Sequence, residues 1–255
     1  MPRTSRAKSK TGIYHILIRG INQQRIFEQD GDCERFLECI SAVKKQTGFK
    51  LFAYCLMGNH AHLLLMEGGE PIGQVLRRLG ARYVQWFNNK YKRAGHLFQD
   101  RFRSEPVEND EYFSEVLLYI YQNPVKAGVC RAPIDYEWSS RRYLGGEGGI
   151  VDEAALAGLV SIPAVIEREQ ELIEDDLIGE EKSGRWAAYE DNEVAAMFWK
   201  LCGVQSTADF QRLPNEEQMM AVARVRSAGI PIRQIARVVG VGKGTVEYWF
   251  KKYMT

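Results

Sequence analysis

Apolar residues recur along the first half of this chain with two different periods, which together predict a sheet flanked by helices. Alternating or short continuous apolar runs predict strands at residues 13–20, 49–56 and 60–66. A period near 3.6 predicts amphipathic helices over residues 30–46 and from Pro71 to Lys90. Asp30 or Asp32 is the expected cap of the first helix, and Pro71 is typical of the start of the second.

Two further elements complete this part of the chain. Residues 96–107 predict a turn and then a strand. Asn109 and Asp110 begin a helix that we expect to stop at Asn123 and Pro124, because proline disfavours helical geometry in the residue before it. The resulting order is that of a ferredoxin-like βαββαβ sheet with one additional helix, so the predicted class is α+β.

The pattern changes after residue 145. Gly-Gly-Glu-Gly-Gly at residues 145–149 predicts a flexible boundary, and residues 164–178 and 190–202 predict helices. Three short helices are expected at residues 216–227, 232–239 and 243–252, with a glycine-containing turn before the last. We therefore expect a domain over 1–145, an acidic helical connector over 146–205 and a helix-turn-helix over 206–255. The alternative for the last part is a three-helix packing module with no role in DNA binding.

Charge is distributed unevenly between these parts. Residues 1–144 hold 22 Lys or Arg against 15 Asp or Glu, a net +7. Residues 145–192 hold 3 against 13, a net −10, and residues 193–255 hold 9 against 5, a net +4. Two basic blocks indicate two surfaces for a polyanion, while the acidic block is most simply a solvated face. The candidate nucleic-acid-binding residues are Arg3, Arg6, Lys8, Lys10, Arg19, Arg77, Arg78, Arg82, Arg101, Arg103, Lys243, Thr245, Tyr248 and Lys251.

Cysteine usage and hydropathy predict a cytoplasmic protein. The five cysteines are odd in number and scattered, which is typical of free thiols in a reducing compartment. The basic, polar start does not resemble a signal peptide, and no apolar run is long enough to span a bilayer.

Candidate chemistry gathers on the third strand and the last helix. His60 and His62 alternate with Ala61, so their imidazoles share one strand face and can bind a divalent metal. His-x-His also arises by chance on solvent faces, and His15 on the first strand is most simply structural. Tyr119 and Asn123 are i and i+4 on the helix, so an amide oxygen and a nucleophilic phenol lie together. Tyr121 is the rival nucleophile.

These motifs resemble those of a known family. Met-Gly-Asn-His-Ala-His-Leu-Leu-Leu at residues 57–65 resembles the histidine–hydrophobic–histidine (HUH) motif of single-tyrosine transposases. Tyr-Ile-Tyr-Gln-Asn-Pro-Val-Lys-Ala-Gly at residues 119–128 is similar to the signature of their REP-associated branch. Residues 14–20, 98–104 and 136–140 also match that group, so the resemblance covers about residues 5–145.

The resemblance implies a metal-dependent single-strand DNA endonuclease and strand transferase. In this family pattern His60, His62 and Asn123 would bind Mg²⁺ or Mn²⁺, and Tyr119 would form a 5′-phosphotyrosine link at palindromic hairpin repeats. Family members act as monomers or homodimers, and residues 206–255 would add a site for duplex DNA. One alternative is a non-catalytic DNA-binding regulator, which has no need of all four site residues. Another is a two-histidine phosphoesterase acting on RNA ends, which usually needs two separate His-x-Ser/Thr motifs.

Overall fold

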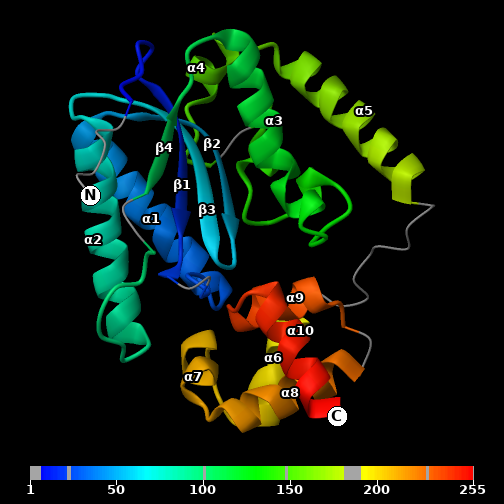
Figure 1. The fold of residues 1–255 in the computed structure, drawn as a ribbon. Coiled ribbons are helices and arrows are strands. Elements are labelled where there is room, and N and C mark those ends of the chain that lie inside the picture. The colour runs from blue at the N-terminus through cyan, green and yellow to red at the C-terminus, as the bar shows by residue number, and fades with distance from the viewer. Residues whose placement is uncertain are drawn as a thin grey trace.

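A four-stranded antiparallel sheet organises the first half of the molecule (Figure 1). The computed structural model describes residues 7–21, 24–99, 102–146, 149–180, 191–227 and 230–254, with the side chains of 173–180 and 254 excepted. The strands are β1 (Ile13–Arg19), β2 (Lys50–Met57), β3 (His60–Met66) and β4 (Arg103–Pro106), in the order β2-β3-β1-β4. Helix α1 (Asp30–Thr47) joins β1 to β2, α2 (Ile72–Lys90) joins β3 to β4, and α3 (Asp110–Lys126) follows β4. The predicted α+β class and βαββαβ order are confirmed.

Each face of the sheet has its own hydrophobic core. On one face Ile16 and Leu63 pack with α1 and α2 around Phe36 and Tyr83. On the other face Leu64 and Cys55 pack against Leu117 and Ile120 of α3. Figure 1 shows α3 on the opposite side of the sheet from α1 and α2. Because side chains alternate between the two faces of a strand, the residues of β3 that share a face with His62 and Leu64 point toward α3.

Strand β3 lies between two neighbours, which fixes the positions of its side chains. Its whole length pairs with β1, from Ile13 opposite Met66 to Arg19 opposite His60. It also pairs with β2, where Cys55 lies opposite His62. Any slip of one residue would move the apolar residues of β3 to the wrong face, so this register is strongly specified.

Two local predictions were wrong. The N-cap of α1 is Gln29, while Asp32 is at position N3 and accepts hydrogen bonds from the backbone N–H groups of Glu28 and Gln29. Helix α3 continues past Pro124 to Lys126, because proline has a helical φ and only removes one donor near the helix end. The strand predicted within residues 96–107 is confirmed as β4, Arg103–Pro106.

The segment after α3 packs on the second core. It contains the 3₁₀ helices η2 (Pro133–Asp135) and η3 (Ser140–Tyr143), then α4 (Glu153–Ala157) and α5 (Ile162–Glu180). Leu156 and Val165 are buried in that core. Arg141 and Glu169 form a buried ion pair with a shortest N–O distance of 2.7 Å. Residues 149–172 are therefore attached to the sheet, whereas the domain boundary at 145 stays a prediction.

Five helices form a separate C-terminal module with a third core. They are α6 (Asp191–Cys202), α7 (Thr207–Arg212), α8 (Asn215–Ser227), α9 (Ile232–Val239) and α10 (Lys243–Met254). The helices predicted over 190–202, 216–227, 232–239 and 243–252 are confirmed, and α6 contributes Val194 and Phe198 to this core. The boundary at 205 stays a prediction.

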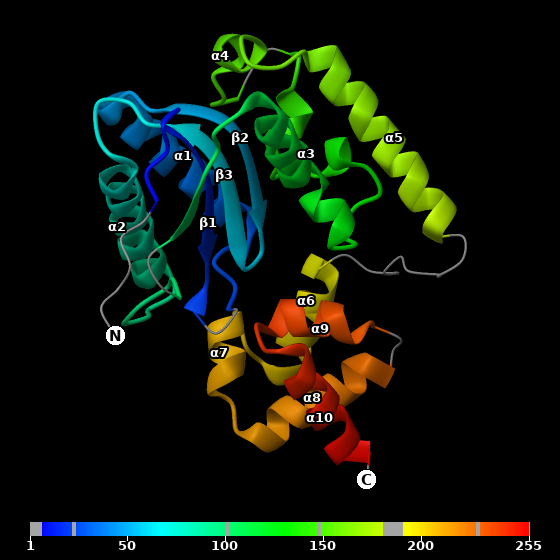
Figure 2. The ribbon, with the colours of Figure 1, turned by 45° about the horizontal axis from the view of Figure 1, so that its top comes forward.

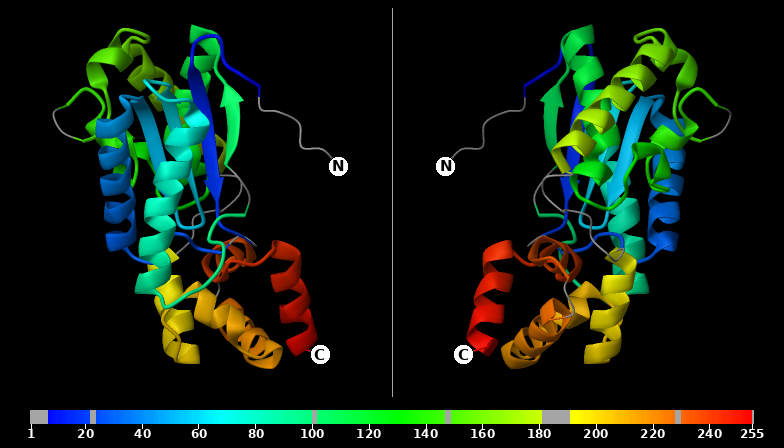
Figure 3. Two further views of the ribbon diagram at one scale, coloured as in Figure 1. Left: turned by 90° about the vertical axis from the view of Figure 1, so that its left-hand side faces the viewer. Right: turned by 90° about the vertical axis from the view of Figure 1, so that its right-hand side faces the viewer.

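The C-terminal module lies at the end of the sheet where β1 ends and β3 begins (Figures 2 and 3). Three contacts fix it there. Thr207 bonds to Glu28, Gly240 approaches the backbone of Gln24, and Arg237 donates to the Ala127 carbonyl. Within the described ranges, no helix is both long enough and apolar enough to cross a membrane.

Candidate active site

The two histidines of β3 point toward the amide of Asn123 on α3. His60 Nε2 lies 3.3 Å from Asn123 Oδ1, and His62 Nε2 lies 3.3 Å from Asn123 Nδ2. The imidazole centroids are 5.0 Å apart. The sheet and α3 thus bring together the three residues that the sequence predicts as metal ligands. In the described part of the chain no group of three or more His, Cys, Asp or Glu is placed to hold a metal ion.

Each ring has one partner that fixes its tautomer. His60 Nδ1 lies 2.6 Å from Asn59 Oδ1, which can only accept, so Nδ1 carries the proton. His62 Nδ1 lies 2.9 Å from His15 Nε2, where either ring can donate, but the Asn123 amide nitrogen can only donate to His62 Nε2, so Nδ1 carries the proton here too. With Nδ1 of each ring protonated, both Nε2 lone pairs face Asn123. At His60 this places a lone pair against the Asn123 carbonyl oxygen, an arrangement that a cation between them would satisfy.

Burial keeps both rings neutral, the form that binds metals. Desolvation lowers the pKa of His60 to about 4, opposed by its contact with Asn123 and reinforced by Arg19. Desolvation also lowers the pKa of His62 to about 2, together with the neighbouring His60 and His15. The pKa of His15 is lowered too, chiefly by burial. The proposed ligands therefore need no deprotonation at neutral pH.

Tyr119 and Tyr121 lie in opposite environments. Tyr119 is 42% exposed, and its ring centroid is 5.4 Å from that of His62 and 5.9 Å from that of His15. The ammonium of Lys126 lies 5.6 Å from the centre of the Tyr119 ring. Tyr121 is 1% exposed in the second core, where burial raises the pKa of its phenol. The geometry therefore favours Tyr119 over its rival as the accessible nucleophile.

A cavity of about 420 Å³ opens beside these rings. It is lined by His15, His62 and Tyr119 together with Arg103, Glu105, Tyr112, Glu115, Leu17 and Val116. Sequence reasoning missed His15 and Glu105 as site residues. His15 shares a strand face with Leu17, which pairs with His62, but this pairing is not visible in a single sequence. Glu105 carried no sequence signal of its own, because its position opposite His15 depends on the pairing of β1 with β4.

The predicted nucleic-acid-binding residues fall into separate places. Arg19 and Arg103 are exposed near the histidines, whose pKa values they lower. Lys8 and Lys10 lie at the other end of the sheet, where the Lys10 backbone meets Glu108. Exposed Arg77, Arg78 and Arg82 lie on α2, across the sheet from the site, and Arg78 is paired with Glu70.

The remaining predicted contacts lie on α10 or outside the described ranges. Thr245 and Tyr248 are exposed on α10, as are Lys251 and Lys243, the last paired with Glu247. Arg3, Arg6 and Arg101 lie outside the described residues.

Comparison with known proteins agrees with this geometry. Residues 8–123 match the family model described as transposase IS200 like. These residues are thus similar to IS200-like transposases, and we call this part of the chain the transposase domain after that similarity. A protein of Haemophilus influenzae assigned as a REP-associated tyrosine transposase is 31% identical over 104 residues, which are 36% of this chain and 58% of that protein. This part of the chain is therefore also similar to a REP-associated tyrosine transposase.

The transposase fold is also seen in a solved structure. The structure of a REP-associated tyrosine transposase bound to a REP hairpin superposes with a TM-score of 0.50 and 20% identity, covering 64% of this chain and 90% of that chain. At this identity the likeness is one of fold. Since this chain spans 58% of the length of the Haemophilus relative, its own activity and substrates are matters for proposal.

Proposed function

We propose that this transposase is a metal-dependent single-strand DNA endonuclease and strand transferase that uses Tyr119 as its nucleophile. The observation that carries the proposal is the convergence of His60 and His62 on Asn123, with the exposed phenol of Tyr119 beside His62. A DNA-binding protein without catalysis has no need to bury two neutral histidines around an amide next to an exposed tyrosine.

His60, His62 and Asn123 would hold Mg²⁺ or Mn²⁺. Their fit rests on the two Nε2 lone pairs and on the unfavourable approach of His60 Nε2 to the Asn123 oxygen, 3.3 Å away. Asn59 and His15 would orient the two rings from behind, as partners of metal-binding histidines commonly do. When bound, such an ion would polarise the scissile phosphate and stabilise the charge of the leaving oxygen.

The protein's own groups would then carry out a transesterification. The Tyr119 oxygen forms a bond to phosphorus as the phenol proton passes to solvent, and the bond from phosphorus to the 3′ oxygen breaks. The 3′ oxygen takes up a proton, leaving a free 3′-hydroxyl and a 5′-phosphotyrosine. Because the ester bond is conserved, the hydroxyl can attack the phosphotyrosine and rejoin strands. Arg19 and Arg103 are the closest of the predicted cations to bind the strand backbone.

The proposed substrate is a palindromic hairpin repeat, by analogy with the relative that was solved with a REP hairpin. Helix α10 would add a site for duplex DNA through exposed Thr245, Tyr248 and Lys251. The turn at Gly240, with φ at +67°, gives α9 and α10 the connection typical of a helix-turn-helix.

The test is a covalent-adduct assay on labelled single-stranded oligonucleotides from the flanks of the gene, including hairpins, with Mn²⁺. We expect a denaturation-resistant adduct that peptide mass spectrometry maps to Tyr119, and that is absent with Tyr119→Phe and with chelator. Lys45→Ala, exposed on α1 across the sheet from the cavity, serves as a control that keeps the adduct. An adduct on Tyr121 would refute the assigned nucleophile. Absence of any adduct despite DNA binding would favour the non-catalytic alternative.

A further inference from the structure

Lys126 lies on the same face of α3 as the proposed nucleophile and the proposed amide ligand. Tyr119, Asn123 and Lys126 follow one another at the i, i+4 and i+7 positions of the helix, the spacing of a single helical stripe. The side chain of Lys126 is exposed. A third polar group is thus available on the face of α3 that meets the histidines of the sheet.

The ammonium of Lys126 reaches back along α3 to the ring of Tyr119. Its Nζ atom lies 5.6 Å from the centre of that ring. Side chains of a helix lean toward its N-terminus, so a side chain that starts two turns after Tyr119 passes over the turn that carries Asn123. The ammonium therefore lies on the side of Tyr119 that is nearer to Asn123, where the phosphate attacked by the phenol would meet the proposed metal ligands.

The charge of Lys126 is available to a ligand. In the described part of the chain, its ammonium has the Tyr119 ring as a neighbour and no carboxylate as an ion-pair partner. A lysine in the last turn of a helix can also act on structure alone, because it offsets the partial negative charge of the helix end. The two roles differ in what they predict for DNA, so they can be separated by experiment.

The charges on the two sides of Tyr119 differ in sign. The cavity beside the ring is lined by Glu105 and Glu115 against one arginine, Arg103. Glu115 lies four residues before Tyr119 on α3, whereas Lys126 lies seven residues after it. A phosphate near the phenol is therefore repelled by the carboxylates on one side and attracted by the ammonium on the other. This asymmetry favours a phosphate on the Lys126 side of the ring.

We propose that Lys126 is a further catalytic residue, whose ammonium binds the phosphate that Tyr119 attacks. This inference rests on the proposed function. As the Tyr119 oxygen bonds to phosphorus and the bond to the 3′ oxygen breaks, negative charge increases on the phosphate oxygens that do not bridge the strand. Lys126 donates N–H hydrogen bonds to one of these oxygens and keeps all of its protons, so the balance of the transesterification is unchanged.

The first test measures a phosphate contact without cleavage. Its background is full-length Tyr119→Phe, which keeps the ring beside Lys126 and lacks the nucleophilic oxygen. Single-stranded oligonucleotides from the flanks of the gene are titrated at several salt concentrations. One phosphate contact contributes about 0.7 to the slope of log affinity against log salt concentration, so adding Lys126→Met should reduce the slope by that amount. Lys45→Met, at an exposed lysine in the last turn of α1, is the matched control and should leave the slope unchanged.

The second test measures cleavage with Tyr119 present, as the single-turnover rate at saturating DNA with Mn²⁺. Lys126→Met should lower this rate by about 100-fold, as the loss of one group that stabilises transition-state charge commonly does. Lys126→Arg keeps the charge and should restore most of the rate, and Lys45→Met should not change it. A rate for folded Lys126→Met within a few-fold of the wild type would overturn the catalytic role.

Together the two tests separate this proposal from the proposed function. An adduct on Tyr119 with an unchanged salt slope in Lys126→Met would reject the role of Lys126 alone. A reduced slope without any Tyr119 adduct in the wild type would reject the proposed function and leave Lys126 as a contact to the strand backbone. Absence of any single-strand binding by Tyr119→Phe would refute the phosphate contact as well.

Discussion

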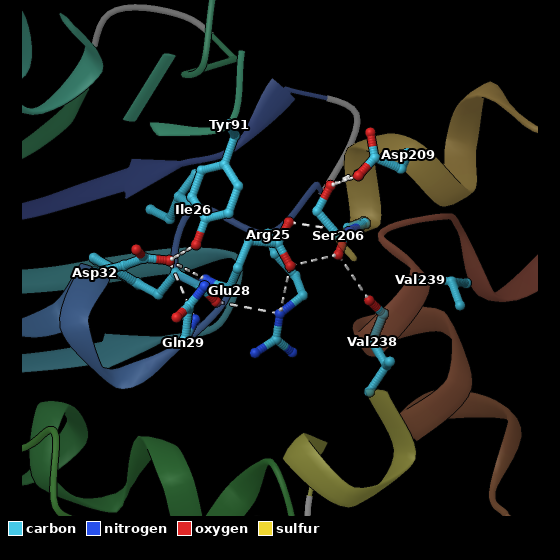
Figure 4. A network of polar contacts seen from close by, with 12 residues as sticks. Arg25, Ile26, Glu28, Gln29, Asp32, Tyr91, Ser206, Asp209, Val238 and Val239 are labelled. Atoms are coloured by element: carbon cyan, nitrogen blue, oxygen red, sulfur yellow. Dashed lines mark hydrogen bonds and ion pairs between the residues drawn. The ribbon is translucent and has the colours of Figure 1, made fainter. Parts of the chain in front are cut away.

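Glu28 gives the docking of the C-terminal module a predicted dependence on pH. Its carboxylate accepts from Thr207 N at 3.1 Å and from Thr207 Oγ1 at 3.2 Å, and Arg25 Nε lies 3.6 Å away (Figure 4). Burial nevertheless raises the pKa of Glu28 from 4.5 to about 7, since desolvation outweighs these favourable contacts.

The sign of the effect follows from proton binding. Between pH 4.5 and 7 the folded protein holds a proton on Glu28 that the unfolded chain has released. Stability from this group is fully present below pH 4.5 and is lost as pH rises through 7. Each pH unit in this interval is worth about 1.4 kcal/mol, so the wild type should lose about 3 kcal/mol relative to Glu28→Gln, whose amide never ionises.

The assay is urea unfolding of the wild type and of Glu28→Gln from pH 4.5 to 8. The quantity compared is the difference between their free energies of unfolding at each pH. Subtraction removes the titration of all other groups that the two proteins share. Glu34→Gln, on the exposed side of α1, is the matched control and should show no pH-dependent difference. A difference between Glu28→Gln and wild type that stays constant from pH 4.5 to 8 would show that the carboxylate is not protonated in the folded protein, and the reasoning would fail.

Three further predictions concern metal, DNA and the buried ion pair. Mn²⁺ should raise the melting temperature of the wild type but not of His60→Ala, because two of the three proposed ligands do not suffice; an equal shift in the variant would place the ion elsewhere. Lys251→Ala on α10 should weaken duplex binding and reduce the salt slope by about 1 while leaving cleavage of unpaired single strands unchanged, as measured by titrations at several salt concentrations. Arg141→Met should destabilise the protein by about 3–5 kcal/mol in denaturant unfolding, since it leaves the Glu169 carboxylate buried without its partner; a loss below 1 kcal/mol would contradict this.

Much of the transposase domain could be predicted because its pattern is local. The alternation around His60 and His62 gave the strand face, and the i, i+4 spacing of Tyr119 and Asn123 gave the helix face. His15 was assigned a structural role because pairing between strands 47 residues apart is not visible in a single sequence. Pro124 was given too much weight, since proline near a helix end removes only one hydrogen bond.

The pattern of apolar residues could not predict contacts between distant parts of the chain. Thr207 and Glu28 are 179 residues apart, and nothing in either neighbourhood indicates the other. The same holds for Arg237, whose hydrogen bond to Ala127 spans 110 residues. Such pairs depend on how two cores dock, which periodicity within one element does not encode.

Helix α3 carries both Tyr119 and Asn123, whereas His60 and His62 belong to the sheet. The nucleophile and the amide donor therefore keep a constant separation whenever α3 shifts as a rigid body, and only their distance from the histidines changes. The geometry of the site then depends on where one helix, α3, lies against the sheet. Arg237 of the C-terminal module donates to the carbonyl at the end of that helix. A partner that displaced the module would remove this bond, and a resulting shift of α3 would move Tyr119 and Asn123 together relative to the two histidines.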